Sequence, residues 1–283
     1  MMRQLSHIMT VKFPYVDALA GLSQVQEFML STQLESLPVI ENGKILGVID
    51  YWDVLKTHPN RIAADAMSDY FKEVVPGTFV WEAKEAIDSH GIKLFIVKQQ
   101  DQVVGIVSPS QVALEIGRQF DVLTELYKKD YIYYQAVKVL KERQLLSLIF
   151  LDVNNFGKID KQYGHIAGDQ ILREIGQFLK AKMSKETHVS RFGGDEFLIL
   201  TPYKLEKTRS FAEILLREVK EHRFYKEIPV SFSAGIVKGI CHGFMKNSVP
   251  ALERLVNCAS LASTQAKKES MGLVVANQVE LGY

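Results

Sequence analysis

The sequence has 283 residues, of which 47% are hydrophobic and 24% are charged, and its formal net charge is +1. This is the composition of a folded globular protein, and the length is sufficient for two domains with separate cores. Because the charge is nearly balanced, a broad basic surface for nucleic acid is not expected, and any recognition of phosphate must be local.

The N-terminal segment and the cysteines bear on the cellular compartment. The first 13 residues lack the apolar core of a signal peptide, and no run approaches the roughly 18 apolar residues that span a bilayer. Cys241 and Cys258 lie 17 residues apart, without the spacing of a zinc site or a disulfide framework. We therefore expect a cytoplasmic protein with no membrane partner.

An internal repeat occupies the first 118 residues. The segment LPVIENGKILGVID at 37–50 aligns without a gap on FIVKQQDQVVGIVS at 95–108, an offset of 58 residues that places Gly47 on Gly105. In each copy an amphipathic helix is expected before two short apolar strands. The apolar helix positions are Leu22, Val25 and Met29 in the first copy, and Val80, Ala83 and Ile87 in the second. One such unit can hardly bury its own sheet face, so the two should pack together.

This pattern resembles the CBS-domain pair, in which two β-α-β-β-α units dock sheet to sheet and leave clefts that often hold adenine nucleotides. In that family a hydroxyl residue followed three positions later by an acidic one commonly holds the ribose and phosphates. The first copy has Asp50 and Asp53 at these positions, and the second has Ser108 and Gln111. The resemblance implies Asp53 and Ser108 as contacts of an adenine nucleotide. Both also lie where a strand turns into a helix, so helix capping is the alternative role.

A helix is predicted to follow the second copy. The sequence SPSQ at 108–111 has the form of a capping box with proline at the first helical position. Val112, Ile116 and Phe120 are spaced by four, which predicts a helix over 109–120 with no flexible linker after it. Such a helix is a stiff connector through which the first domain could reorient the second, and a simple spacer is the alternative.

The second half of the chain places acidic residues at the ends of apolar runs. The run 145–151 predicts a buried strand with Asp152 at its end. Two strand-like runs, 189–192 and 197–200, flank a turn that predicts a hairpin. The turn residues are Gly193, Gly194, Asp195 and Glu196. If the hairpin lies beside the first strand, three carboxylates meet there, and their repulsion favours a cation such as Mg²⁺.

The sequence RFGGDEF at 191–197 is an intact copy of the signature of the GGDEF, or diguanylate cyclase, domain. The resemblance extends over about 121–277. Its further matches are DVLTELYKKDYI at 121–132, LDVNNFGKIDKQYGHIAGDQIL at 151–172, VSFSAGI at 230–236 and Ala266-Lys267. It implies an enzyme that condenses two GTP into cyclic di-GMP and two pyrophosphates. Each domain of this type carries one GTP, so a homodimer is implied as well.

The same resemblance implies roles for individual residues. Mg²⁺ (or Mn²⁺) would be held by Asp152, the backbone carbonyl of Val153 and Asp195, with Glu196 a further metal ligand or an acid/base group. The residues implied in GTP binding are Asp160 and Asp169 at the guanine, Gly193 and Gly194 at the phosphate-side turn, and Lys267 at the triphosphate. A carboxylate suits guanine because it accepts from both N1–H and N2–H, which adenine cannot supply.

Three positions depart from the family pattern. Gly157 stands where the family has a phosphate-binding Lys, Asp160 where it has Asn, and Met271 where it has Arg. The loss of two cations near a triphosphate should weaken GTP binding. The alternative function is therefore a catalytically weak GGDEF domain that acts as a GTP-binding or protein-docking module. A third reading is an adenylate-charge sensor whose partner is another protein.

These observations together predict an α/β (α+β) protein with two domains. Residues 1–118 would form the tandem CBS regulatory domain, with repeats at about 1–58 and 59–118. Residues 119–283 would form the GGDEF domain, a mainly antiparallel sheet covered by helices, like the nucleotide-cyclase and polymerase palm architecture.

Overall fold

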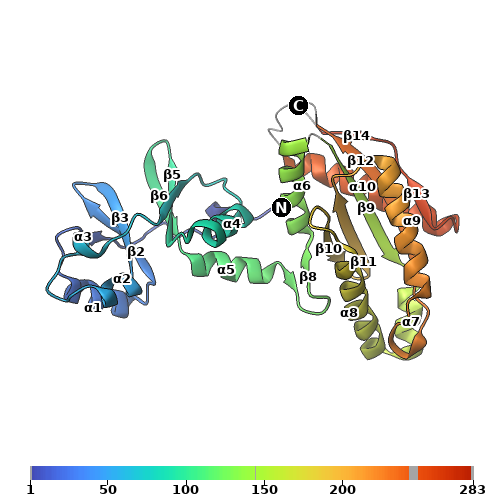
Figure 1. The fold of residues 1–283 in the computed structure, drawn as a ribbon, viewed down its shortest axis with the longest axis horizontal. Coiled ribbons are helices and arrows are strands. Elements are labelled where there is room, and N and C mark those ends of the chain that lie inside the picture. Colours follow the sequence, from blue (N-terminus) through green and yellow to red (C-terminus); the bar gives the residue numbers. More distant parts are fainter. Residues whose placement is uncertain (1, 144, 242–247, 282–283) are drawn as a thin grey trace. The chain divides into compact units, whose positions relative to one another are not determined.

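The computed structural model describes residues 2–143, 145–241 and 248–281. The chain divides into two compact units, one of residues Arg3–Arg118 and one that contains Met2 and the residues from Gln119 onward (Figure 1). We call these the N-terminal unit and the C-terminal unit and describe each by itself. In the described ranges no helix has the length and apolar character needed to cross a bilayer.

The N-terminal unit consists of two copies of one β-α-β-β-α motif. In each copy the first strand runs parallel to the second, and the second runs antiparallel to the third. The first copy comprises β1 (Val16–Asp17), α1 (Leu22–Thr32), β2 (Ser36–Glu41), β3 (Lys44–Asp50) and α2 (Tyr51–Lys56). The second comprises β4 (Phe71–Val74), α4 (Val80–His90), β5 (Leu94–Gln99), β6 (Gln102–Val107) and α5 (Pro109–Arg118). Because α1 and α4 match at an offset of 58 residues, as do β2 and β5, the predicted repeat is confirmed.

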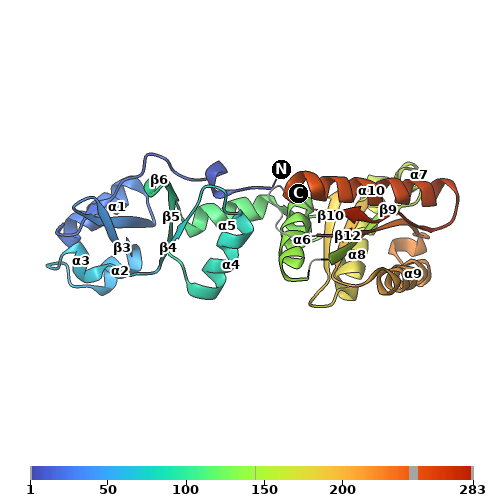
Figure 2. The same cartoon turned by 90° about the horizontal axis from the view of Figure 1, so that it is seen from above.

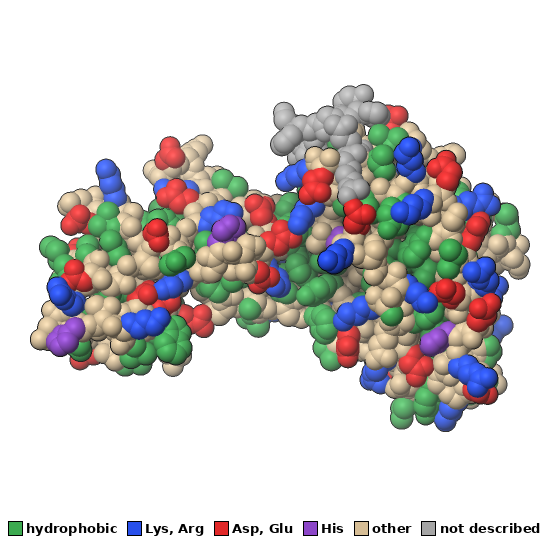
Figure 3. All heavy atoms as spheres, in the orientation of Figure 1, with side chains coloured by type: hydrophobic (Ala, Val, Ile, Leu, Met, Phe, Trp, Pro, Cys, Tyr) green, Lys and Arg blue, Asp and Glu red, His purple; other side chains and the backbone are tan. Residues whose placement is uncertain are grey.

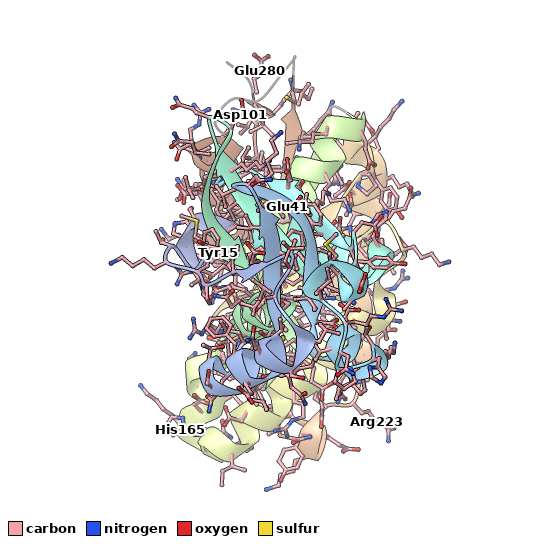
Figure 4. The ribbon with its side chains drawn as sticks, turned by 90° about the vertical axis from the view of Figure 1, so that its left-hand side faces the viewer. Tyr15, Glu41, Asp101, His165, Arg223 and Glu280 are labelled. Atoms are coloured by element: carbon pink, nitrogen blue, oxygen red, sulfur yellow. The ribbon has the colours of Figure 1, made fainter. Side chains whose placement is uncertain are left out.

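Two short helices, η1 (Leu5–His7) and α3 (Ala63–Ala66), complete this unit. The two copies pack sheet against sheet, since Val48 of β3 is buried in one cluster with Leu94 and Ile96 of β5 and Ile106 of β6. In Figure 4, Glu41 and Asp101 mark the ends of the two hairpins, β2–β3 and β5–β6.

The paired glycines of the repeat have a structural reason. A Cβ on Gly47 would meet the Ser68 carbonyl oxygen at 2.8 Å, and one on Gly105 would meet the Thr10 carbonyl oxygen at 3.0 Å. At each glycine another part of the chain crosses the outer strand and forms a β-bridge, Val48 with Ser68 and Thr10 with Ile106. The repeat therefore conserves a close backbone approach that leaves no room for a side chain.

The predicted helix over 109–120 is wrong at its end. Helix α5 stops at Arg118, and Phe120 begins the short strand β7 (Phe120–Asp121), which pairs with β8 (Leu126–Lys128). Gly117 weakens the last turn of the helix. The ring of Phe120 instead packs edge-on against Tyr127, with ring centroids 5.6 Å apart. The chain therefore changes from helix to strand at Gln119, and the stiff helical connector does not extend to Phe120.

The C-terminal unit has a central mixed sheet with the strand order β13-β12-β9-β11-β10-β8-β7, and β14 pairs with β12. Its middle pairs, β12–β9, β9–β11 and β11–β10, are antiparallel. The strands not yet given are β9 (Leu145–Val153), β10 (His188–Gly193), β11 (Glu196–Thr201), β12 (Phe232–Ile240), β13 (Leu273–Val275) and β14 (Val279–Glu280). The helices are α6 (Lys129–Arg143), α7 (Phe156–Tyr163), α8 (His165–Lys182), α9 (Leu205–Glu221), η2 (Tyr225–Glu227) and α10 (Ser248–Lys268).

Helices cover both faces of this sheet. Along β9, Ile149 and Leu151 are buried in the core shared with α8 and α9. Phe150, between them, points to the opposite face and packs against Phe192, over whose ring Lys129 of α6 lies. Figure 2 shows α10 and α9 on opposite sides of the sheet. The predicted mainly antiparallel sheet with helical cover is confirmed.

Candidate active site

The acidic residues singled out in the sequence lie where the central strand β9 meets the hairpin β10–β11. Asp152, near the end of β9, is the direct cross-strand partner of Glu196, the first residue of β11. Asp195 lies in the turn just before Glu196, and its backbone carbonyl accepts from the Val153 N–H at 3.2 Å. The expected neighbourhood of the hairpin and the strand is confirmed, and a rigid strand positions Asp152 and Val153.

The hairpin turn leaves open space around its backbone. Gly194 has a φ of +51°, a conformation that favours glycine, and a Cβ on Gly193 or Gly194 would meet no atom within 4 Å. The turn is held from one side by Arg191, whose Nε and Nη2 donate to the Gly194 carbonyl oxygen at 2.9 and 2.7 Å. An atom of a ligand can therefore approach the backbone of this turn closely.

The carboxylates at this edge retain unbalanced negative charge. Burial raises the pKa of Asp195, and the charge of Asp152 adds to the effect, although Lys267 and Arg191 oppose it. Burial likewise raises the pKa of Glu196, with further contributions from Asp152 and Asp195. Raised carboxylate pKa values from burial and like-charge neighbours are typical of functional sites.

A lysine partly compensates this charge. The ammonium of Lys267, near the end of α10, donates to Asp152 Oδ1, and its nitrogen lies 3.5 Å from the Val153 carbonyl oxygen. Within the described parts of the chain, no group of three or more acidic, histidine or cysteine side chains is arranged to hold a metal ion. Asp152 and Glu196 are cross-strand neighbours, Asp195 lies in the adjoining turn, and Lys267 bonds Asp152, so a joint cation site of the three carboxylates stays a prediction.

The donor set is nevertheless suitable for a divalent cation. Two carboxylates and a backbone carbonyl are the oxygen ligands that Mg²⁺ and Mn²⁺ take. The ammonium of Lys267 already shows that the oxygens of Asp152 and Val153 accept a cation together. Because Asp195 and Glu196 still have raised pKa values with Lys267 in this position, a second positive charge would relieve the remaining repulsion.

The two carboxylates assigned to guanine lie on neighbouring helices. Asp160 is half-buried on α7, and Asp169 is exposed in the first turns of α8. Asp160 Oδ2 lies 3.2 Å from Nδ1 of His165, whose side chain is 89% exposed and lies at the periphery in Figure 4. The Asp160 carboxylate also packs directly over Gly168, where no side chain fits. Asp160 is therefore positioned by the α7–α8 junction.

The remaining departures from the family pattern lie on the surface. Gly157 in α7 is exposed, with no atom near its would-be Cβ, and Met271 is 63% exposed just beyond α10. Neither position offers a cation. Figure 3 shows Lys and Arg side chains interspersed with Asp and Glu over the visible face of this unit.

In the N-terminal unit, Asp53 belongs to a charge cluster between the two copies. Its Oδ1 and Oδ2 accept from the ammonium of Lys93 at 2.6 and 2.7 Å, and Asp50 Oδ2 lies 3.1 Å from the same nitrogen. Asp50 is the N-cap of α2, and Asp53 completes a capping box by accepting from the Asp50 N–H at 3.0 Å. Asp53 therefore supports the cap of α2 and pairs with Lys93, and its contact with an adenine nucleotide stays a prediction.

Ser108 forms the predicted capping box. Gln111 Oε1 accepts from the Ser108 N–H at 2.9 Å, and Ser108 Oγ accepts from the Gln111 N–H at 3.3 Å. The Ser108 hydroxyl also pairs with that of Ser110 at 2.7 Å. Capping of α5 is confirmed, and a ligand contact by Ser108 stays a prediction.

Three contributors were not assigned from the sequence. Lys93 bonds residues 40 and 43 positions away, and nothing local signals that contact. Arg191 and Asp121 were visible in the motif segments, yet their ion pair at 2.9 Å spans 70 residues. Only their shared presence in the motifs could have suggested it.

Comparison with known proteins agrees with this arrangement. The family model described as "Diguanylate cyclase, GGDEF domain" matches residues 118–272, and that described as "CBS domain" matches residues 5–59. The chain belongs to the diguanylate cyclase GGDEF-domain family. It combines this GGDEF domain with CBS sequence at its N-terminal side, as the resemblances implied.

Curated relatives are similar over the GGDEF domain. Diguanylate cyclase DgcS of Shewanella oneidensis is 31% identical over 127 residues, which are 43% of this chain and 43% of the relative. Diguanylate cyclase VdcA of Vibrio cholerae is 33% identical over 128 residues, 43% of this chain and 38% of the relative. The chain thus spans less than half the length of these relatives.

Among solved structures, the coiled coil and GGDEF domain of DgcB from Caulobacter crescentus, in complex with c-di-GMP, is similar with a TM-score of 0.50. The match has 16% sequence identity and covers 58% of this chain and 88% of that one. It supports the fold of the C-terminal unit.

Proposed function

We propose that this protein is a diguanylate cyclase, which condenses two GTP into cyclic di-GMP and releases two pyrophosphates. The observation that carries the proposal is the cross-strand pairing of Asp152 with Glu196 beside the open Gly193-Gly194 turn, with carboxylate pKa values raised by burial and mutual repulsion. Membership of the GGDEF family supports the reaction class.

Metal binding is assigned to the oxygens around Asp152. Asp152, the Val153 carbonyl and Asp195 would hold Mg²⁺ or Mn²⁺, with Glu196 as a further ligand or acid/base group. The bound ion would neutralise charge that develops on the phosphates in the transition state. Asp152 and Glu196 are positioned by β9 and β11, so these two carboxylates need little reorganisation, while Lys267 would leave Asp152 for the triphosphate.

The bond changes are the same in both halves of the reaction. The 3′-oxygen of one GTP forms a bond to the α-phosphorus of the other, and the bond from that phosphorus to the pyrophosphate oxygen breaks. The proton of the 3′-hydroxyl needs an acceptor, and Glu196 with its raised pKa is the candidate. Two such steps close the ring, and two pyrophosphates leave.

Substrate contacts are assigned to residues of α7, α8, the hairpin turn and α10. Asp169 and Asp160 would face guanine, the Gly193-Gly194 turn would pass beside the phosphates, and Lys267 would act as a point charge on the triphosphate. Each domain would carry one GTP, so product formation requires two copies of the chain. We therefore propose a homodimer as the active form.

Purified protein incubated with GTP and Mg²⁺ should form cyclic di-GMP, detected by chromatography and mass spectrometry. Asp195→Ala, which removes a proposed metal ligand, should form little product. Glu213→Ala, on the exposed face of α9, is its matched control for removal of an acidic side chain. GTP binding without product would favour the second candidate, a GTP-binding or docking module. The absence of cations at Gly157 and Met271 is the observation that favours this candidate.

The N-terminal unit is assigned a regulatory role, with an adenine nucleotide as ligand at the cleft that includes Asp53. The Asp53 carboxylate can accept from ribose hydroxyls, and Lys93 beside it can donate to phosphate. Ser108 would serve the equivalent cleft of the second copy. Turnover measured with and without AMP or ATP determines whether the nucleotide activates or inhibits the cyclase.

A further inference from the structure

We infer that Arg191 is a positioning residue, which fixes the Gly194-Asp195 turn against β7 through its ion pair with Asp121. The inference rests on the proposed cyclase activity and extends it to two residues that make no proposed contact with metal or GTP. Its basis is a chain of hydrogen bonds that runs from the start of the C-terminal unit to the turn.

The guanidinium of Arg191 joins two separate groups. Nε and Nη2 both donate to the Gly194 carbonyl oxygen, at 2.9 and 2.7 Å, and Nη1 donates to Asp121 Oδ1 at 2.9 Å. The side chains of Arg191 and Asp121 are only 14% and 19% exposed. The planar guanidinium has N–H donors in a fixed, forked arrangement and can bond two acceptors at once, whereas the ammonium of lysine is a compact point charge.

Asp121 is itself anchored. Its Oδ1 also accepts from the backbone N–H of Thr124 at 2.9 Å and from the Thr124 hydroxyl at 2.7 Å. Thr124 is fully buried, and its carbonyl packs against the bare backbone of α8 at Gly176, where a Cβ would clash. The contacts therefore lead from the core helix α8 through Thr124 and Asp121 to Arg191.

The turn has few other supports. Gly193 and Gly194 carry no side chains that pack, and the surrounding space is open. Besides the fork of Arg191, the turn is tied by the Val153 N–H to the Asp195 carbonyl and by the pairing of Gly193 with Glu196. Because two glycines lower the stiffness of the backbone, loss of the fork should let Asp195 sample positions away from its place beside Asp152.

Displacement of a catalytic group affects turnover more than substrate affinity. A misplacement of about 1 Å can cost about 100-fold in rate. We therefore expect Arg191→Met to lower kcat by about 10- to 100-fold, while KM for GTP changes by less than about threefold. Arg191→Lys keeps a charge for Asp121 but lacks the fork, so it should recover only part of the loss.

The test uses the full chain with Mg²⁺ and GTP, and compares kcat and KM of wild type, Arg191→Met, Arg191→Lys and Asp121→Asn. The matched control is Arg209→Met, which removes an exposed arginine that pairs with Glu213 on α9. Wild-type kinetics are expected for this control. Since Asp121 acts through Arg191, the double variant Asp121→Asn with Arg191→Met should be no slower than Arg191→Met alone.

A second measurement does not depend on turnover. Amide hydrogen exchange of the segment 190–197 should be faster in Arg191→Met and in Asp121→Asn than in wild type, and unchanged in Arg209→Met. If Arg191→Met fails to fold, Arg191→Lys and Asp121→Asn carry the same comparison.

The outcomes separate the two proposals. A wild-type protein that forms no cyclic di-GMP overturns the proposed function, while the exchange rates still decide whether Arg191 holds the turn. Unchanged exchange in the turn, a kcat within about twofold of wild type, or a loss expressed only in KM overturns the positioning role of Arg191.

Discussion

Each unit of this protein places a lysine ammonium on acidic oxygens that come from distant parts of the chain, and the two arrangements differ in charge balance. In the N-terminal unit, Lys93 bonds Asp53 and Asp50, which also cap α2. In the C-terminal unit, Lys267 bonds Asp152 beside Asp195 and Glu196.

The direction of the pKa shifts distinguishes the two clusters. Burial acts to raise the pKa of Asp50, but the N–H of Asp53 and the ammonium of Lys93 outweigh it, and the pKa is lowered. Burial likewise opposes the charge of Lys93, and its pKa is raised because Asp53 and Asp50 stabilise that charge. At Asp195 and Glu196 burial and repulsion prevail and the pKa values are raised. The first cluster is internally satisfied, whereas the second has capacity for a further cation.

The largest effect is expected from removing a carboxylate of the C-terminal cluster. Asp195→Ala or Asp152→Ala should lower cyclic di-GMP synthesis by about 1,000-fold or more, because each removes a proposed metal ligand and its stabilisation of charge. The melting temperature of Asp195→Ala should be equal to or above that of wild type, since repulsion is relieved. Near-normal synthesis by Asp195→Ala would show that the proposed mechanism is wrong.

The sequence predicted the elements of this site better than its contacts. The apolar run before Asp152 and the paired glycines carry local signals of strand and turn, so β9 and the β10–β11 hairpin were found. The end of α5 was missed because Phe120 continues the helical spacing, while its packing on Tyr127 is a tertiary contact. The bonds of Lys267 to Asp152, of Lys93 to Asp53 and of Arg191 to Asp121 join residues 115, 40 and 70 positions apart. No periodicity reports such pairs.

The second prediction concerns ligand binding by the N-terminal cluster. If an adenine nucleotide contacts Asp53, Asp53→Ala should weaken AMP or ATP binding by about 1–3 kcal/mol, the cost of removing a partner from a charge-assisted hydrogen bond. If Asp53 only supports the helix cap, the variant should lose about 1 kcal/mol of stability with no change in affinity. Calorimetric titration with AMP and ATP, together with melting curves, separates these outcomes.

Asp88→Ala is the matched control for this measurement, because Asp88 is an exposed acid on α4 that pairs with Lys84. If neither nucleotide binds to or shifts the melting curve of wild type, the adenine assignment is wrong. The tandem would then be a structural unit whose charge cluster is already complete.

The third prediction tests the lysine of the C-terminal cluster. Lys267→Met should bind Mn²⁺ about 2- to 5-fold more tightly than wild type without nucleotide, because the ion no longer displaces the ammonium of a partly exposed ion pair worth about 0.5–1 kcal/mol. The same variant should bind GTP more weakly. Electron paramagnetic resonance of free Mn²⁺ measures the first effect. Lys268→Met, the next residue on α10, controls for the general loss of positive charge. Equal Mn²⁺ affinity in both variants would contradict the competition.

The smallest effect is the pH dependence of stability, which should have opposite signs in the two units. The folded-state pKa of Asp50 is lowered, so its stabilisation is present at neutral pH and is lost as the pH falls below about 4. The folded-state pKa of Asp195 is raised, so the native state binds the proton more tightly, and stability falls as the pH rises from about 4 through the raised value.

Two amide variants isolate these contributions in urea unfolding between pH 3 and 7. Wild type should exceed Asp50→Asn in unfolding free energy at pH 7, and the difference should shrink in acid. The unfolding free energy of Asp195→Asn should increase relative to that of wild type as the pH rises. Mg²⁺ should reduce this increase, because the ion offsets the charge that the variant removes. Tryptophan fluorescence reports the N-terminal unit alone, since the two tryptophans of the chain, Trp52 and Trp81, both belong to it. Circular dichroism reports the helices of both units, so a transition that it shows and tryptophan fluorescence does not belongs to the C-terminal unit. The difference in unfolding free energy between wild type and variant should change with pH in opposite directions for the two variants. If it changed in the same direction for both, the two lysine clusters would not differ in charge balance, and the interpretation of their pKa shifts would be wrong.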